Sequence, residues 1–369
     1  MKNAKVLNFK LCLLAPLKIL QMTLKPVIRV WHKRQGFLTE LAFSFAFLAF
    51  TVFGCNESLR TTTHLDAKSI NDLVPEATRI IREGLADDNP RVRAKAIEVV
   101  ATTKQVILMP DVQWLLGDES VPVRFLAALT IGDIEYSLAK NKAAQLLRDQ
   151  DENVRVAAAY ATARLGAPDS LKLIYKAITS KNQTVRANAA LLLGKSGDKS
   201  ALKPLYWALR DKDSDDKVRF QAVEAIATLG DERIYPRLWA MLISAYADDR
   251  VMGIRAMGAL GTVEAKNALI TKLDDDILEV RLAAAEQLGT LGETTGEAEV
   301  LDVFTKNLTA GLEKEGLERV NVLTALAIGQ IGTVSLTKFL PQLLEDESKF
   351  VRVAAAKAVF QCTMKNRPR

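Results

Sequence analysis

Residues 280–292 read VRLAAAEQLGTLG, and this phrase recurs from residue 92 onward as V-R-x-x-A, then A-L-G or a similar triplet, then a glycine. Seven clear copies begin at residues 92, 123, 154, 185, 218, 280 and 351, and two weaker copies begin at residues 252 and 320. The successive intervals are 31, 31, 31, 33, 34, 28, 40 and 31 residues. A period of about 20–50 residues is typical of architectures in which one supersecondary unit is stacked many times.

Each copy has the pattern of an amphipathic helix. When its first residue is counted as position 0, apolar residues fall at positions 0, 4, 7 or 8, and 11, which share one face of an α-helix. The glycine at position 12 ends the helix, because glycine readily adopts the left-handed conformation. These glycines are Gly166, Gly197, Gly230, Gly292 and Gly332. A second amphipathic segment, such as SLTKFLPQLLED at 335–346, then leads through an acidic turn into the next copy.

One repeat is therefore a helical hairpin of about 31 residues, and the hairpins must stack because none can bury its apolar face alone. The nine copies resemble HEAT repeats, and they are most similar to the short HEAT-like repeats of the phycobilin-lyase type. The resemblance covers roughly residues 70–365. It implies an all-α fold, a right-handed α-solenoid of about nine HEAT-like helical hairpins. Two copies depart from the pattern, with Met252-Gly253 in place of Val-Arg and Asn321 in place of arginine.

The N-terminal segment predicts export. A basic cluster at 29–34 precedes an apolar run at 37–53, which ends in Val52-Phe53-Gly54-Cys55. This is the layout of a secretory signal peptide. The end of the run resembles the lipobox of bacterial lipoproteins, which implies that the chain is cut before Cys55 and that Cys55 carries the lipid. Phe53 is bulkier than that pattern prefers.

A signal anchor that is never cut is the alternative, because seventeen apolar residues can just span a bilayer. In both cases the basic side stays in the cytoplasm and the repeats are exported. The chain thus divides into a leader (1–54), a polar tether (55–69) and a repeat solenoid (70–366). We expect it in the bacterial cell envelope, lipid-anchored, with the repeat domain on the periplasmic side. The start (Met1 or Met22), the choice of inner or outer membrane and the oligomeric state stay open.

The charge balance argues against nucleic-acid binding. The net charge is +6, but residues 1–54 hold eight basic groups and one acidic group, which leaves 42 basic and 43 acidic residues in 55–369. The repeats therefore lack the positive field that phosphate-backbone binding needs. The three cysteines and two histidines match no zinc spacing and no histidine-based nucleophile system. We therefore predict no catalytic residue, no metal site and no cofactor.

Six copies have an aspartate five residues before position 0 and an arginine directly after it. The six are Asp87 with Arg93, Asp118 with Arg124, Asp149 with Arg155, Asp213 with Arg219, Asp275 with Arg281, and Asp346 with Arg352. The carboxylate can accept bonds from free N–H groups at the next helix start, and the arginine can bond a carboxylate of its own or a neighbouring repeat. Because the feature recurs from unit to unit, we interpret it as structural rather than as a row of site charges.

Position 2 of the phrase is apolar in every copy, although it lies nearly opposite the core positions on a helical wheel. In HEAT proteins the helix that carries the phrase lines the concave face, and exposed apolar strips usually mark partner sites. Six candidate partner-binding residues follow from positions 2 and 6. They are Phe125, Leu129, Val156, Tyr160, Leu191 and Phe220. The alternative is that these side chains pack between adjacent hairpins.

Three tryptophans, Trp114, Trp207 and Trp239, take similar places on the first helices of their hairpins. We expect them to fill gaps between stacked hairpins, and the alternative is an outer recognition stripe. The function predicted from these features is a non-enzymatic protein-binding scaffold or adaptor that binds a protein partner through its concave face. The alternative is a HEAT-like-repeat enzyme or enzyme accessory subunit of the lyase type. HEAT-like folds include a di-iron hydroxylase with repeated His-Glu pairs, and this chain has no such pair.

Overall fold

The computed structural model describes residues 69–365 of the 369-residue chain. In this range the protein is built from α-helices and short 3₁₀ turns, without a β-strand, which confirms the predicted all-α solenoid. Within residues 69–365, no helix combines the length and the apolar character that crossing a membrane would require. The predicted leader, Cys55 and the tether up to residue 68 lie outside the described residues, as does residue 366 of the predicted solenoid.

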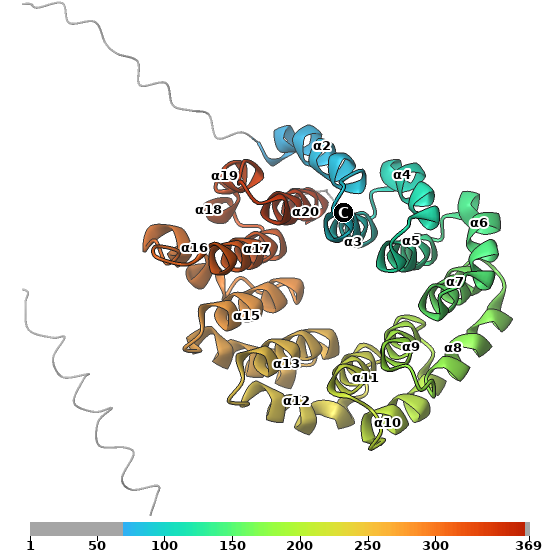
Figure 1. Ribbon diagram of the computed structural model, residues 1–369. Helices are drawn as coiled ribbons and strands as arrows, with labels where there is room; N and C mark the ends of the chain where they lie inside the picture. Colours follow the sequence, from blue (N-terminus) through green and yellow to red (C-terminus); the bar gives the residue numbers. More distant parts are fainter. Residues whose placement is uncertain (1–68, 366–369) are drawn as a thin grey trace, which may run out of the picture. The chain divides into compact units, whose positions relative to one another are not determined.

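Nine hairpins follow one another, and in each an outer helix precedes an inner helix (Figure 1). The outer helices are α2 (Val74–Leu85), α4 (Met109–Trp114), α6 (Lys140–Gln145), α8 (Leu171–Ala177), α10 (Leu202–Arg210), α12 (Tyr235–Leu242), α14 (Val263–Ile270), α16 (Glu297–Thr305) and the short pair α18 (Val334–Thr337) and α19 (Leu340–Leu344). The inner helices, which contain the repeated phrase, are α3 (Pro90–Thr103), α5 (Val121–Ile134), α7 (Glu152–Arg164), α9 (Gln183–Lys195), α11 (Asp216–Thr228), α13 (Ala247–Leu260), α15 (Leu278–Thr290), α17 (Lys314–Ile331) and α20 (Lys349–Lys365).

The inner helices begin and end where the phrase predicts. At their starts, the side chains of Asn89, Asp151 and Asn182 accept hydrogen bonds from backbone N–H groups of the first turn. At their ends, each of the five predicted glycines at position 12 has a positive φ, for example 98° at Gly166. In the first two copies a non-glycine residue, Lys104 or Glu135, takes the same left-handed conformation.

The sixth copy begins three residues earlier than the phrase at 252 indicates. Gly261 has a φ of 66°, as expected for position 12. Arg250 donates to the carbonyl of Ser244, six residues before it, as Arg93 does to the carbonyl of Asp87. Both observations put position 0 at residue 249, so the predicted start at 252 is wrong. The intervals of 34 and 28 residues become two intervals of 31 residues.

The described hairpins close into a ring, which the repeats did not predict (Figure 1). The last inner helix, α20, packs against α2 and α3 of the first hairpin. At this seam Gly84 lies so close to Val353 that a Cβ on the glycine would be 3.6 Å from Cγ2 of the valine. The Nζ atom of Lys349 lies 2.6 Å from Oδ2 of Asp87. The first and last hairpins therefore pack on each other as neighbours do.

Candidate partner-binding surfaces

The predicted arginines and aspartates form a ladder between hairpins. Arg93 pairs with Asp118 of the next hairpin and Arg124 pairs with Asp149, with Nε–Oδ2 distances of 2.8 and 3.0 Å. Each arginine also donates to carbonyls of the turn before its own helix, as Arg124 does to Asp118 at 2.8 Å and to Glu119 at 3.1 Å. One arginine thus fixes its own turn and the turn of the following hairpin.

The partners in this ladder lie 25 residues apart, and this offset also identifies rungs that the six predicted pairs left out. Arg186 Nη1 lies 2.7 Å from Asp211, and Arg250 Nη2 lies 2.9 Å from Asp275. Asn321, which replaces the arginine in the eighth copy, donates to Asp346 at 3.1 Å. The sequence contained a signal for these contacts, because arginine and aspartate recur at a constant spacing of 25 residues.

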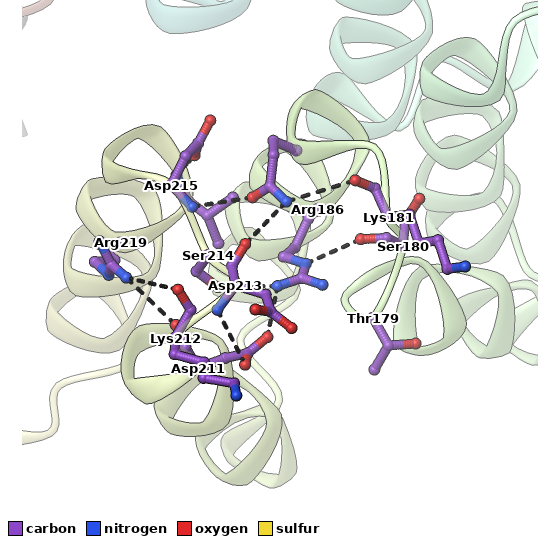
Figure 2. A network of polar contacts seen from close by, with 12 residues as sticks. Thr179, Ser180, Lys181, Arg186, Asp211, Lys212, Asp213, Ser214, Asp215 and Arg219 are labelled. Carbon is purple, nitrogen blue, oxygen red and sulfur yellow. Dashed lines mark hydrogen bonds and ion pairs between the residues drawn. The ribbon is translucent and has the colours of Figure 1, made fainter.

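Asp213 is not the ladder aspartate of its hairpin. The interval before this copy has 33 residues, and its longer turn presents Asp211 to Arg186 instead (Figure 2). Arg186 Nη1 also donates to Ser214 Oγ at 3.0 Å, and its Nε donates to the carbonyl of Ser180. The side chain of Asp213 is exposed, while its carbonyl accepts a bond from Gln183.

The ladder is interrupted after Arg155, Arg219 and Arg281. The residues 25 positions later are Ser180, Ser244 and Lys306, which offer no carboxylate. Arg155 donates to the carbonyls of Asp149 and Gln150, Arg219 pairs with Asp216 of its own helix, and Arg281 pairs with Glu299 of α16. Arg352 donates to the carbonyls of Asp346 and Glu347, and Lys349 rather than Arg352 reaches Asp87 at the seam.

The ladder carboxylates are engaged inside the ring. Burial acts to raise the pKa of Asp149, but the hydrogen bonds from Arg124 and from the N–H of Asp151, together with the charges of Arg124 and Arg155, lower that pKa below its ordinary value. At the seam, burial likewise acts to raise the pKa of Asp87, but the hydrogen bonds from Lys349 and from the N–H of Asn89, with the charges of Lys349 and Arg93, together lower that pKa. Because the paired charges satisfy each other, the ladder holds the hairpins together and leaves no row of free carboxylates for a ligand.

The predicted apolar strip is not an exposed surface. Phe125, Leu129, Val156 and Tyr160 are buried, and Leu191 and Phe220 are partly buried against the core. The ring of Tyr160 lies against Gly132 of the preceding inner helix, and its hydroxyl donates to Asp133 at 2.9 Å. Burial and the nearby Asp133 raise the pKa of Tyr160. The exposed-strip prediction is therefore wrong, because the neighbouring inner helices cover these positions.

A groove does open on the inner helices of the last four hairpins, and we call it the inner groove. Its volume is about 660 Å³. It is lined by Ala247, Asp248, Val251, Arg255, Ile277, Glu279, Val280, Glu318, Arg319, Val322, Leu323 and Phe350. Val251 and Val322 stand at position 2 of their copies, the position that the strip prediction singled out in other hairpins.

Charged side chains of both signs accompany the apolar residues of the inner groove. Arg319 Nη2 lies 3.7 Å from Glu279, and Ser348 donates to Glu318 at 2.6 Å. Arg255 belongs to the same lining, at position 6 of the sixth copy. Apolar side chains accompanied by charged ones are the usual composition of a protein interface.

Comparison with known proteins finds matches to HEAT repeats between residues 78 and 251. The matches overlap, at 78–163, 109–182, 141–215 and 171–251. No curated protein matches the chain closely enough to count as a relative.

The chain is also similar to solved structures, among them the following three. Human deoxyhypusine hydroxylase is 18% identical, with 71% of this chain and 98% of that one covered and a TM-score of 0.36. The complex of CpcE and CpcF of phycocyanin lyase from Nostoc sp. PCC7120 is 18% identical, with 68% and 93% covered and a TM-score of 0.37. Kap121p is 16% identical, with 76% and 37% covered and a TM-score of 0.31.

The tryptophans of the outer helices do not fill gaps between hairpins. Trp114, Trp207 and Trp239 are 77%, 43% and 40% exposed, so the gap-filling prediction is wrong. Cations lie over two of the rings, with Lys142 Nζ 4.9 Å from the ring centre of Trp114 and the Arg186 guanidinium carbon 5.3 Å from that of Trp207. The outer wall of the ring therefore carries aromatic side chains that are accessible to a partner.

Over residues 69–365, no group of three or more histidine, cysteine, aspartate or glutamate side chains is arranged to hold a metal ion.

Proposed function

We propose that this HEAT-repeat chain is a non-enzymatic protein-binding scaffold, tethered in the bacterial envelope, that binds a segment of its partner in the inner groove. The observation that carries the proposal is the inner groove itself, where apolar side chains of α13, α17 and α20 remain open to a ligand. A partner that buries an apolar side chain there gains the hydrophobic term that dominates most associations.

The charged groups of the inner groove favour binding over catalysis. Glu279 is paired with Arg319, and Glu318 accepts a hydrogen bond from Ser348. General acid–base catalysis needs a titratable group that is positioned to exchange a proton with a substrate. Carboxylates that are already engaged with neighbours orient a partner and select against the wrong charge pattern.

Tethering is the second part of the proposal and rests on the leader sequence. The basic cluster at 29–34, the apolar run at 37–53 and Cys55 have the order of a lipoprotein signal. A lipid on Cys55 would hold the ring at the membrane surface through the polar residues that follow. This location would also keep the ring away from the cytoplasm, where an enzyme of the lyase type would meet its substrates, so it favours a binding scaffold over that alternative.

Charge substitutions in the inner groove test the binding site. Val251→Glu and Val322→Glu should each abolish capture of the partner that copurifies with the wild-type chain from membranes, because each puts a charge among the apolar side chains of the groove. Val334→Glu, at an exposed valine of α18 outside the groove, is the matched control and should retain the partner. Quantitative mass spectrometry reads the capture, and circular dichroism checks that all three variants fold. Retention of the partner by both groove variants would refute the assignment.

Cys55→Ala tests the tether. The wild-type chain should label with radioactive palmitate and begin at residue 55 after processing, whereas Cys55→Ala should accumulate as an uncut precursor without label. N-terminal sequencing and autoradiography measure the two properties. Cys362→Ala, which removes a buried cysteine of α20, is the control and should label like the wild-type chain. Full labelling of Cys55→Ala would contradict the lipid assignment without affecting the groove.

A further inference from the structure

A second open pocket lies on the outer wall of the ring, and we call it the basic pocket. Its volume is about 1030 Å³. Its basic and aromatic lining residues are Lys199, Lys203, Tyr206, Trp207, Arg210, Lys212 and Arg233. Residues 199, 203, 206, 207 and 210 recur at helical spacing, so they form one face of α10 and the turn before it, while Leu205 and Ala208 are buried on the opposite face.

The basic pocket has an excess of positive charge. Five of its lining residues are basic, and its one acidic lining residue, Asp211, is already paired with Arg186 (Figure 2). Arg233 is paired with Asp231 at 2.5 Å. Within residues 69–365, no carboxylate lies within ion-pair distance of Lys199, Lys203, Arg210 or Lys212. This concentration of unpaired cations contrasts with the net charge of −1 over residues 55–369 and favours an anionic ligand.

Aromatic rings make cation–π contacts with arginines in and beside the basic pocket. The guanidinium carbons of Arg210 and Arg233 lie 5.2 and 5.6 Å from the ring centre of Tyr206. Arg186 lies over the ring of Trp207, which stays partly exposed. Cation–π contacts at these distances restrict the long basic side chains, so a ligand would lose less side-chain entropy on binding them.

The turn that carries Lys212 is fixed from both sides. Arg186 bonds Asp211 and Ser214, and Arg219 donates to the carbonyls of Asp211 and Lys212 at 3.5 and 3.4 Å (Figure 2). Asp215 N–H donates to the side chain of Gln183 at 3.0 Å. This network holds Lys212 at the edge of the basic pocket.

We propose that the basic pocket binds an acidic segment of a partner protein, with carboxylates on Lys203, Arg210 and Lys212 and an apolar side chain against Trp207. The unpaired cations run from Lys199, in the turn before α10, to Lys212, in the turn after it. A helix rises about 1.5 Å per residue, so these cations span on the order of 15–20 Å. That length fits several carboxylates spaced along a chain better than one phosphate group. Tyrosine, tryptophan and arginine are also the residues that dominate the binding energy of protein interfaces.

Fluorescence anisotropy with the full chain in detergent tests this inference. The probe is a labelled 12-residue peptide of alternating glutamate and glycine with one central phenylalanine. We expect saturable binding that weakens as salt rises, because the charges are exposed to solvent. Lys203→Glu/Arg210→Glu should lower the affinity at least about tenfold, and Trp207→Ala should lower it severalfold. The matched control is Lys176→Glu/Lys181→Glu, which reverses two exposed lysines of the preceding hairpin outside the pocket and should bind like wild type.

Three results would overturn the inference. The first is no saturable binding of the peptide, and the second is equal losses in the pocket and control variants. The third is binding of inorganic polyphosphate or of phosphatidylglycerol vesicles that displaces the peptide and does not change in Trp207→Ala, which would show a general anion site. Val322→Glu in the inner groove should leave peptide binding unchanged. The proposal for the basic pocket is therefore tested independently of the proposal for the inner groove.

Discussion

Replacing Asp149 by alanine should lower the free energy of unfolding of the ring by about 3 kcal/mol. The two oxygens of Asp149 accept hydrogen bonds from Nε and Nη2 of Arg124, each at 3.0 Å, and the two side chains are only 10% and 16% exposed. The substitution leaves a largely buried guanidinium whose remaining acceptors are the carbonyls of Asp118 and Glu119. Urea unfolding followed by circular dichroism measures the change.

Asp169→Ala is the control for this prediction. Asp169 pairs with Lys172 at 2.7 Å, but both side chains are exposed, so water replaces the lost partner at little cost. The stability of Asp169→Ala should therefore stay close to that of the wild-type chain. Equal losses in Asp149→Ala and Asp169→Ala would show that the ladder contributes no more than a surface ion pair.

The Arg124–Asp149 pair should also make the free energy of unfolding depend on pH, in a direction that its pKa shift determines. The pKa of Asp149 is lowered in the folded chain, because the bonds from Arg124 and the N–H of Asp151 and the nearby arginine charges together exceed the opposing effect of burial. A carboxylate with a lowered pKa stabilises the fold above its unfolded pKa, about 3.9, and loses that contribution as the pH falls through the folded pKa. The stability difference between the wild-type chain and Asp149→Ala should therefore be full at pH 7 and shrink below about pH 4.

The hairpins could be predicted from sequence because each carries its own signals. The apolar spacing identifies one buried face, and the glycine at position 12 marks the helix end. Where these signals conflict, the glycine is the better guide. In the sixth copy the apolar residues around Met252 fit a shifted register, but Gly261 and Arg250 both agree with a start at residue 249. The left-handed position admits few residues, whereas many residues can fill an apolar face.

The candidate surfaces were less predictable than the hairpins. A helical wheel shows that Phe125 and Tyr160 lie off the main core face, but it does not show whether the next hairpin covers them. Both are buried, while Val251 and Val322 at position 2 of other copies line the inner groove. The difference depends on how closely neighbouring inner helices approach, which is a property of pairs of hairpins rather than of one repeat.

Closure of the ring is a still longer-range property. The curvature of a solenoid is the sum of small rotations between neighbouring repeats, so no single repeat determines whether the two ends meet. At the seam, α20 packs against α2 and α3. A local sign of this closure is the ion pair at Asp87. Asp87 belongs to the first hairpin of the described residues, and Lys349 of the last hairpin takes the place that an arginine of the preceding hairpin takes elsewhere.

Val353→Asp should open the ring. Val353 is 4% exposed and lies against Gly84 of the first hairpin, so an aspartate there would be buried without a partner. Such a substitution typically costs more than about 4 kcal/mol when the charge stays buried. Separating α20 from α2 and α3 hydrates the carboxylate while the contacts between all other neighbouring hairpins are kept. The radius of gyration from small-angle X-ray scattering should therefore increase, while the helical circular dichroism signal stays near that of the wild-type chain.

Val334→Asp makes the same substitution at a valine of α18 that is 87% exposed, and it should leave the radius of gyration unchanged. Loss of most of the helical signal in Val353→Asp would mean that the seam is required for the fold as a whole. That outcome would contradict the description of the ring as hairpins stabilised mainly by their nearest neighbours. An unchanged radius and unchanged melting temperature would instead show that α20 does not pack against the first hairpin in solution. The expected result is a larger radius of gyration with the helical signal kept. It requires that α20 packs against the first hairpin in the wild-type chain. It also requires that this interface costs less free energy to separate than the interfaces between the other hairpins.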